Sequence, residues 1–258
     1  MIRIALVSYF NTRPFTDGLR HWFGEDELTL TEVPPSECAA QLKAGECDMA
    51  LMPVGALSDF EGLTVMKDHC IGADGKVDSV FLFSHVPVSQ AKALVLDPHS
   101  RSSNGLAAVL MQEYWERKLP LIQPEGERFS QIKGDVCGVA IGDKAFASKD
   151  QYPYVYDLAE IWKRYSGLPF VFAVWAYRPD AVNVDMLDRL RIALEWGRAN
   201  RQKSAQRWAA HYGYEMDDAV NYLMQSISYE FDSAKHEAMK KYFHLLQDVS
   251  ASLPLIGA

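Results

Sequence analysis

The residues best suited to chemistry lie in the run LDPHSRSS, Leu96–Ser103. Asp97 and Pro98 end an apolar stretch that is typical of a buried strand. An amphipathic helix follows, since apolar residues then recur at helical spacing. The first turn of such a helix offers free backbone N–H groups, which attract a carboxylate or a phosphate. Here it also offers three hydroxyls and a guanidinium, from Ser100, Ser102, Ser103 and Arg101. A helix cap would need only one of these serines, so the run predicts an anion-binding loop.

A second loop of this kind follows the first apolar run, Ile4–Val7, and contains Asn11, Thr12 and Arg13. Because Pro14 disfavours helix at the preceding residue, we expect Asn11–Arg13 to remain a loop. Asn11 would then face the ligand crevice that forms beyond the ends of strands in an open α/β sheet. The alternatives are that Asn11 satisfies its own turn and that Arg13 faces solvent.

Three further positions are weaker candidates, and each has a structural explanation. Ser79 begins a β-favouring run and would ordinarily be structural. Gly142 would let a ligand approach the backbone, whereas Asp143 is better explained as a helix N-cap. The seven histidines and four cysteines form no metal-binding spacing, and the chain has no P-loop, GxGxxG or GxSxG motif. We therefore predict no metal site.

The chain repeats its own pattern, so we expect two similar units to position these residues. Ile4–Val7 corresponds to Leu94–Leu96, and each leads through a polar loop into a helix that we expect to begin near Gly18 and near Gly105. Lys43–Asp48 and Lys133–Cys137 each contain a glycine that would close a short helix ahead of a buried strand. The starts of both pairs are 90 residues apart. Two such copies predict two α/β lobes.

The predicted lobes are discontinuous in sequence. Ser79–Ser84 and Phe170–Ala176 are β-favouring runs that would cross between the lobes. We expect residues 1–84 with 176–258 to form lobe 1, and residues 85–175 to form lobe 2. Beyond Arg178 the pattern is helical, and this tail would pack on lobe 1. The fold class is α/β, with two small sheets flanked by helices, a ligand cleft between the lobes and a helical C-terminal tail.

The bulk composition limits the partners. The chain has 258 residues, of which 48% are hydrophobic, and a net charge of −8. This charge repels nucleic acids and acidic membranes, so an anionic ligand must be captured by local groups. Four separated cysteines are typical of reduced, packed thiols. With no export signal and no apolar run long enough to span a membrane, we expect a cytoplasmic protein.

Several motifs in the same order resemble the chorismate dehydratase family, which opens the futalosine route to menaquinone. They are SYFNTRPF (8–15), CDMALMPVGAL (47–57), SVFLFS (79–84), LDPHSRSS (96–103), VAIGDKA (139–145), YDLAEIW (156–162) and GLPFVFAVWA (167–176). Ser102 stands where the family more often has threonine, so the hydroxyl is kept and a methyl is lost. The resemblance implies a two-lobed fold of the periplasmic-binding-protein type II-like class.

The resemblance also implies that chorismate loses water to give 3-[(1-carboxyvinyl)oxy]benzoate, without metal or organic cofactor. Asn11 and Ser79 match the family's reacting centre: Asn11 would orient the departing hydroxyl, and Ser79 would hold a carboxylate or the hydroxyl network. The predicted substrate-binding residues are Thr12, Arg13, Ser100, Arg101, Ser102, Ser103, Gly142 and Asp143. Arg101 either contacts the substrate or supports its loop from behind. Since no base residue is evident, the substrate's own enolpyruvyl carboxylate would take the proton.

Three alternatives remain open. The related dihydroxynaphthoate synthase of the same pathway shares the expected fold. A non-catalytic solute-binding protein would normally need an export signal, and a sensing domain would need a DNA-binding module. Oligomeric state is also open, and the C-terminal helices could make the contacts of a homodimer.

Overall fold

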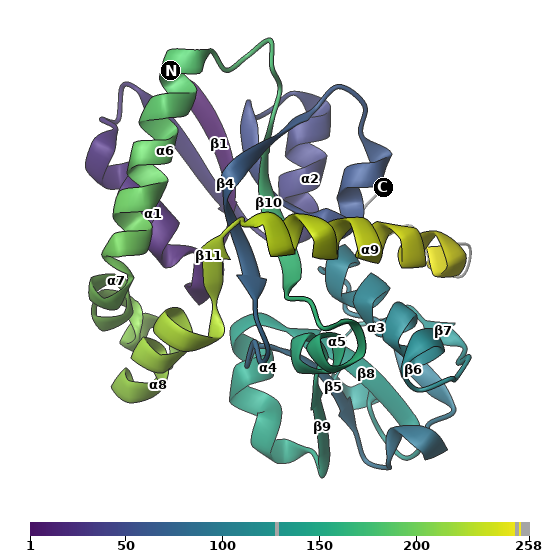
Figure 1. The fold of residues 1–258 in the computed structure, drawn as a ribbon. Coiled ribbons are helices and arrows are strands. Elements are labelled where there is room, and N and C mark those ends of the chain that lie inside the picture. Colours follow the sequence, from purple (N-terminus) through teal and green to yellow (C-terminus); the bar gives the residue numbers. More distant parts are fainter. Residues whose placement is uncertain (127–128, 251–252, 254–258) are drawn as a thin grey trace. The chain divides into compact units, whose positions relative to one another are not determined.

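The computed structural model describes residues 1–126, 129–250 and 253. The described chain folds into two compact units, each built around its own sheet (Figure 1). The first unit contains Met1–Gly72 and Val171–Asp232. The second contains Ala73–Phe170 and the segment that begins at Ser233.

In the described part of the first unit, strands form one mixed sheet in the order β11-β4-β10-β3-β1-β2. Their bounds are β1 Ile2–Val7, β2 Leu28–Val33, β3 Met49–Pro53, β4 Thr64–Ala73, β10 Phe170–Tyr177 and β11 Ser228–Glu230. β1 is parallel to β2 and β3, whereas β10 is antiparallel to β3. Every residue of β3 is buried, as expected for a strand covered on both faces.

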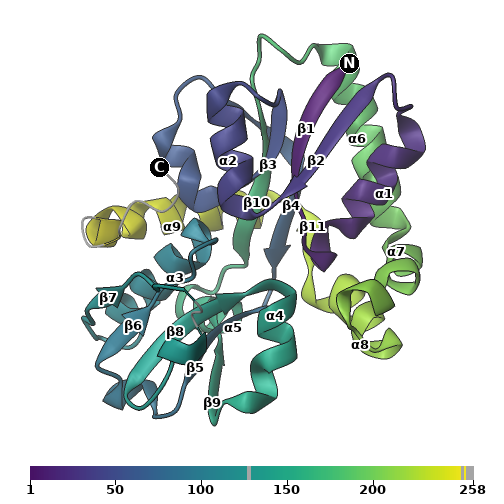
Figure 2. The ribbon, with the colours of Figure 1, turned by 180° about the vertical axis from the view of Figure 1, so that it is seen from behind.

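The helices of the first unit are α1 Arg13–Trp22, α2 Pro35–Ala44, α6 Val184–Ala199, α7 Arg201–Trp208 and α8 Met216–Asn221. Short 3₁₀ segments cover Phe10–Thr12, Val54–Asp59 and Ala210–Tyr212, and a π-helical turn covers Tyr222–Ser226. α1 and α6 lie side by side in both ribbon views (Figures 1 and 2). α2 stops at Gly45, whose φ of 72° is the left-handed helix stop predicted from the sequence.

The described part of the second unit contains a sheet in the order β7-β6-β8-β5-β9. Its strands are β5 Val80–Ser84, β6 Ala93–Val95, β7 Leu121–Ile122, β8 Val136–Ile141 and β9 Tyr154–Asp157. β6 is parallel to β7 and β8, and β5 is antiparallel to β8 and β9. The helices are α3 Arg101–Glu113, α4 Gly142–Ser148, α5 Leu158–Ser166 and α9 Ser233–Ser250, with 3₁₀ segments at Val88–Gln90, Phe129–Gln131 and Lys149–Gln151. The predicted α/β class, with two sheets flanked by helices and a C-terminal helix, is confirmed.

The compact units differ from the predicted lobes in two respects. The chain leaves the first unit within β4, at Gly72, so the run Ser79–Ser84 forms a strand of the second unit and not a crossing. The second predicted crossing does contain a unit boundary, between Phe170 and Val171 in β10. The helical tail is divided, because α9 belongs to the second unit. α9 packs on α3, and its buried Tyr242 meets the ring of Phe170 at 5.1 Å.

The predicted helix starts near Gly18 and Gly105 are wrong. α1 begins at Arg13 and α3 at Arg101, which places both glycines inside helices. Each glycine lies where a second helix approaches closely. A Cβ on Gly18 would come 3.0 Å from Gly197 Cα on α6, and one on Gly105 would come 2.8 Å from Leu246 Cδ1 on α9. The repeated glycine therefore reflects helix packing and not a helix start.

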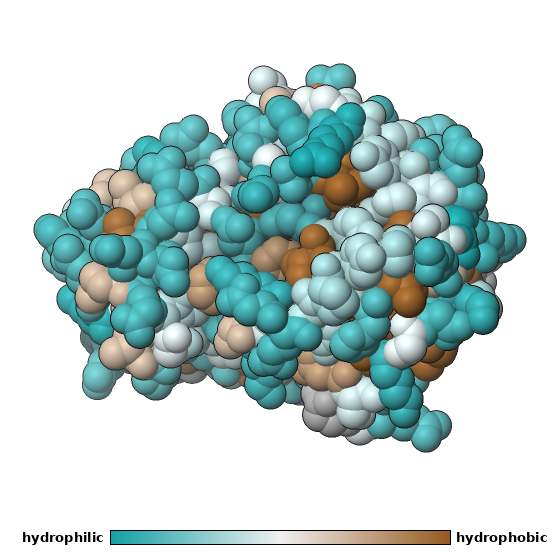
Figure 3. Space-filling model, turned by 90° about the horizontal axis from the view of Figure 1, so that it is seen from below, coloured by the Kyte–Doolittle hydropathy of each residue, from teal (hydrophilic) through white to brown (hydrophobic). Residues whose placement is uncertain are grey.

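The face of the molecule shown in Figure 3 is mostly hydrophilic, and apolar residues show there in small, separate patches. Within the described residues, no helix combines the length and the apolarity that a membrane crossing requires.

Candidate ligand-binding loops

The 3₁₀ turn after β1 contains Asn11, which bonds two tyrosines of the first unit. The half-buried Asn11 donates from Nδ2 to the Tyr222 hydroxyl at 3.3 Å. Its backbone carbonyl accepts from the Tyr229 hydroxyl at 2.8 Å. A primary amide has two N–H donors and one carbonyl acceptor, so the bond to Tyr222 uses a single donor. The other side-chain N–H and the carbonyl can recognise a hydroxyl.

The two tyrosines escaped the sequence analysis because they are 211 and 218 residues from Asn11 in the chain. Tyr222 opens the π-helical turn Tyr222–Ser226, a rare element that is frequent at functional sites. Its ring stacks with Phe10 at 6.0 Å between centroids. Burial raises the pKa of Tyr229 well above its ordinary value, so this phenol stays protonated and donates.

Thr12 and Arg13 are both buried and are used within the first unit. The Thr12 hydroxyl donates to the carbonyls of Val7 at 2.5 Å and Tyr9 at 2.8 Å. Arg13 Nη2 lies 2.6 Å from Glu32 Oε2, and its guanidinium is 5.5 Å from the centre of the Trp208 ring. These contacts fix the turn that contains Asn11 to the rest of the first unit.

The prediction that Asn11–Arg13 form a loop is wrong, since Phe10–Thr12 is a 3₁₀ turn and α1 begins at Arg13. Pro14 fits the first turn of α1, where its missing N–H leaves no bond unmade. The buried ion pair of Arg13 and the fully buried ring of Phe15 outweigh the local bias against helix before proline.

The other predicted residues of the second unit meet at one edge of its sheet. Val80, at the start of β5, pairs with Ile141 at the end of β8. Phe81 pairs with Asp157, the last residue of β9. β6 is parallel to β8, so its carboxyl end reaches the same edge. The same edge of the sheet therefore holds Ser79, the Ser100–Ser103 loop and the Gly142–Asp143 loop.

The Ser100–Ser103 loop forms the first turn of α3. Ser100 is the N-cap, and its Oγ accepts from the backbone N–H of Ser103 at 3.2 Å. This confirms a capping role for Ser100. Ser102 and Ser103 follow on the buried face, each 2% exposed, and the backbone carbonyl of Ser102 accepts from the Tyr242 hydroxyl at 3.1 Å. Arg101 is half-buried, and its charge acts on the same Tyr242 phenol.

A buried carboxylate links this loop to the end of β8. Asp97 accepts from the backbone N–H of His99 at 2.9 Å and from that of Ile141 at 3.2 Å. The Asn104 side chain closes the turn, since it bonds both the N–H and the carbonyl of Asp97 at 2.8 Å. The two loops thus share one anchor.

The Gly142–Asp143 loop is joined to Ser79 through the backbone, because the Gly142 N–H donates to the Ser79 carbonyl at 2.9 Å. Gly142 has a φ of 71°, a conformation that favours glycine. The prediction that Asp143 is an N-cap is wrong. The N-cap of α4 is Ile141, and Asp143 lies within the first turn because the helix begins at Gly142, two residues before the start that an Asp143 cap implies.

Ser79 is 2% exposed and follows a turn that is held by Asp157. The Asp157 carboxylate accepts from the backbone N–H groups of Val77 and Asp78 at 2.9 and 2.8 Å. It also caps α5 through Ala159 and Glu160. Burial raises the pKa of Asp157 to about 6. Asp157 lies in the motif YDLAEIW, but its partners Val77 and Asp78 are 80 and 79 residues away in the chain, so no local pattern gives it a role.

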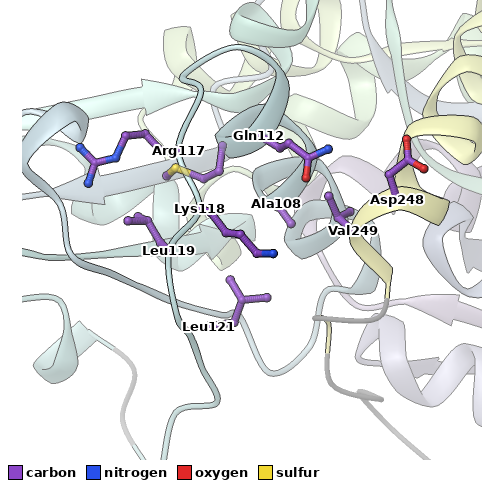
Figure 4. A pocket seen from close by; sticks show the side chains of 9 residues that line it. Ala108, Gln112, Arg117, Lys118, Leu119, Leu121, Asp248 and Val249 are labelled. Atoms are coloured by element: carbon purple, nitrogen blue, oxygen red, sulfur yellow. The ribbon is translucent and has the colours of Figure 1, made fainter.

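A pocket of about 300 Å³ lies elsewhere in the second unit (Figure 4). It is lined by Ala108, Met111, Gln112, Arg117, Lys118, Leu119, Leu121, Asp248 and Val249. The Arg117 guanidinium is engaged by the carbonyls of Ser89 and Ala91. None of the predicted site residues lines this pocket, which adjoins the last turns of α3 and α9 and not the loop edge of the sheet.

Comparison with known proteins gives the family. The sequence profile of a menaquinone biosynthesis family matches residues 2–248, nearly the whole chain. The chain belongs to this menaquinone biosynthesis family. Among curated proteins, the chain is similar to the chorismate dehydratase of Thermus thermophilus, to which it is 27% identical over 200 residues, or 68% of this chain and 69% of the relative.

Solved structures show that this menaquinone biosynthesis protein has a periplasmic-binding-protein-like fold, as predicted. A protein from Archaeoglobus fulgidus superposes with a TM-score of 0.76 at 14% identity, covering 97% of this chain and 98% of the other. A Candida albicans protein described as having the generic periplasmic binding protein fold gives 0.68 at 8% identity, covering 98% and 95%. The aliphatic sulphonate binding protein SsuA of Escherichia coli gives 0.63 at 11% identity, covering 97% and 86%.

Proposed function

We propose that this protein is a chorismate dehydratase, a carbon–oxygen lyase that removes water from chorismate to give 3-[(1-carboxyvinyl)oxy]benzoate. The observation that carries the proposal is the family match over residues 2–248, together with the chorismate dehydratase relative. Chorismate has two carboxylates and one free hydroxyl, and the loops described above offer groups for both. The four cysteines are buried thiols, which fits a reducing compartment, so we assign the reaction to the cytoplasm.

Asn11 and Ser79 are the proposed catalytic residues. The Asn11 amide, held by Tyr222, orients the departing hydroxyl through its remaining N–H and carbonyl. Ser79 holds a substrate carboxylate or the hydroxyl network. Thr12 and Arg13 act by fixing the turn that holds Asn11, since the Thr12 hydroxyl bonds the carbonyls of Val7 and Tyr9 and the Arg13 guanidinium pairs with Glu32. The protein accelerates the reaction by positioning and by preorganised hydrogen bonds.

The remaining proposed contacts belong to the second unit. The first turn of α3 supplies Ser102 and Ser103 at a helix N-terminus, where a carboxylate is favoured. Gly142 is joined to Ser79 by the backbone bond described above, and Asp143 follows it in the chain. We place Arg101 behind the loop, toward Tyr242 of α9.

The reaction is redox-neutral and moves one proton from carbon to oxygen. A proton leaves the ring carbon that bears the enol ether, the C–O bond of the hydroxyl breaks, and the ring becomes aromatic. We propose that the enolpyruvyl carboxylate of chorismate itself takes the proton and passes it to the departing hydroxyl oxygen, so that water leaves and the carboxylate is regenerated. Asn11 and Ser79 then need only to hold the substrate in the reactive geometry.

The decisive experiment is to mix the purified protein with chorismate and to follow mass and ultraviolet absorbance. Loss of one water, with the spectrum of a substituted benzoate, is the expected result. Binding without conversion would contradict the proposal and favour a solute-binding protein, the class of the SsuA structural neighbours.

A further inference from the structure

We propose that Asp157 is a positioning residue for Ser79: its carboxylate holds the turn Val77–Ser79 in place and so sets where the Ser79 hydroxyl lies. This inference rests on the catalytic role that the proposed function gives to Ser79. Asp157 does not contact the substrate in this proposal and affects the reaction only by holding that turn.

The geometry of Asp157 divides its two oxygens between two tasks. Oδ1 accepts from the N–H groups of Ala159 and Glu160, at 3.0 and 3.1 Å, and caps α5. Oδ2 accepts from the N–H groups of Val77 and Asp78, at 2.9 and 2.8 Å. A helix cap needs one oxygen, so the second oxygen serves the turn.

The turn needs an external anchor because its backbone is strained. Asp78 has a φ of 58°, which is uncommon for a residue with a side chain. Such a conformation persists only where its surroundings hold it. On the other side of Ser79, the carbonyl accepts from Gly142 N–H at 2.9 Å. The backbone of Ser79 is therefore fixed by Asp157 before it and by Gly142 after it.

We call the two hydrogen bonds from the Val77 and Asp78 N–H groups to Asp157 Oδ2 the clasp. The charge on Asp157 determines whether the clasp can form. An ionised carboxylate accepts at both oxygens, whereas a protonated one turns one oxygen into a donor. Asp78 in the turn and Glu160 on α5 are the acidic residues whose backbone contacts it, and Lys76 is the cation of the same turn. Lys163 and Arg164 of α5 are paired with Asp74 and Glu160, and the adjacent β5 (VFLFS) carries no charge. Burial raises the pKa of Asp157 to about 6, so acidification near that pH opens the clasp.

Two variants separate the cap from the clasp. Asp157→Ser keeps one oxygen, which suffices to cap α5, but leaves nothing for Val77 and Asp78. Asp157→Asn keeps the cap through its carbonyl and points N–H donors at two N–H groups. For both we expect kcat for chorismate to fall by about 10²-fold, with KM changed little, because a misplacement of about 1 Å costs that much. Asn183→Ala, which removes the cap of α6 at Met186 N–H in the first unit, is the matched control with unchanged kcat.

A double-mutant cycle tests whether Asp157 acts through Ser79. In a Ser79→Ala background, Asp157→Ser should lower kcat little further, because the group that it positions is already gone. An additive loss, or a wild-type kcat in a folded Asp157→Ser protein, would overturn the inference.

Two further measurements cover the remaining outcomes. In the wild-type protein, kcat should decline on the acid side with an apparent pKa near 6, and this decline should be missing from Asp157→Ser; a pH-independent wild-type kcat would also overturn the inference. If wild-type protein does not convert chorismate at all, the proposed function fails. The clasp is then judged by hydrogen exchange, which should be faster at Val77 and Asp78 in Asp157→Ser, and unchanged exchange there would refute it.

Discussion

At the scale of single residues, Asn11 is the group whose loss should damage the chemistry most directly. Its amide is the neutral group of the first unit offered to a hydroxyl, and Tyr222 fixes its orientation. We expect Asn11→Ala to lower kcat for chorismate dehydration by about 10²–10³-fold, the usual effect of losing one preorganised donor. Chorismate binding, measured by calorimetry, should persist. Asn221→Ala, an exposed asparagine on α8, is the control with wild-type turnover, and full turnover in Asn11→Ala would remove Asn11 from the mechanism.

The hydroxyl of Tyr222 should act on the reaction only through Asn11. Tyr222→Phe keeps the ring that stacks with Phe10 and Tyr214 but removes the partner of the Asn11 amide. Since a single hydrogen bond contributes about 0.5–1.5 kcal/mol, kcat should fall roughly 3–10-fold. In an Asn11→Ala background the same change should have no effect on kcat, and an equal loss there would contradict this coupling.

Residue chemistry was the part of the site that the sequence predicted best. Serines and an arginine beside a helix start predicted the first turn of α3, and Ser100 does cap it. The partners of these groups were not predictable. Tyr222, Tyr229 and Tyr242 reach the loops from distant parts of the chain, and nothing in the local pattern around each tyrosine specifies a hydrogen-bond partner.

At the scale of elements, glycines decide how closely helices pack. Gly18 on α1 faces Gly197 on α6, and a Cβ on Gly197 would lie 2.0 Å from the Pro14 carbonyl oxygen. The backbone cannot yield as a flexible side chain would. We expect Gly197→Ala to lower the free energy of unfolding by about 1–3 kcal/mol, as overpacking usually does.

Urea denaturation would measure this loss. Ile192→Ala on the exposed side of α6 is the control, with a change within about 0.5 kcal/mol. A Gly197→Ala protein as stable as wild type would show that α1 and α6 can separate at little cost.

Element boundaries show where sequence reasoning fails for physical reasons. Pro14 led to the wrong prediction of a loop at Arg13, because burial of Arg13 and Phe15 extends α1 back to Arg13. The strands of the predicted repeat are present in both units. Its glycines Gly18 and Gly105 do not start helices but lie where α6 and α9, from later in the chain, pack closely. A helix pattern shows which face is apolar but not which surface covers it, and so α9 was expected on the wrong part of the molecule.

At the scale of the whole molecule, the two units should respond to acid in opposite directions. In the first unit, burial lowers the pKa of His69, which lies 3.2 Å from Glu195. A group with a depressed pKa contributes stability above its unfolded value, here 6.5, and that stability is lost as pH falls through the folded value. In the second unit, the raised pKa of Asp157 has the reverse effect. The stability that it contributes is fully present below pH 3.8 and is lost as pH rises through about 6.

Acidification from pH 7 to pH 5 should therefore weaken the first unit relative to the second, although it opens the turn beside Ser79. Site-resolved hydrogen exchange would compare the β1–β3 amides with those of β5 and β8, after correction for intrinsic exchange rates. His69→Gln should reduce the acid loss in the first unit, because glutamine does not titrate, and Asp157→Ser should remove the acid gain in the second. If both units lose protection equally, and neither variant changes this, the buried charges of His69 and Asp157 do not set the pH response.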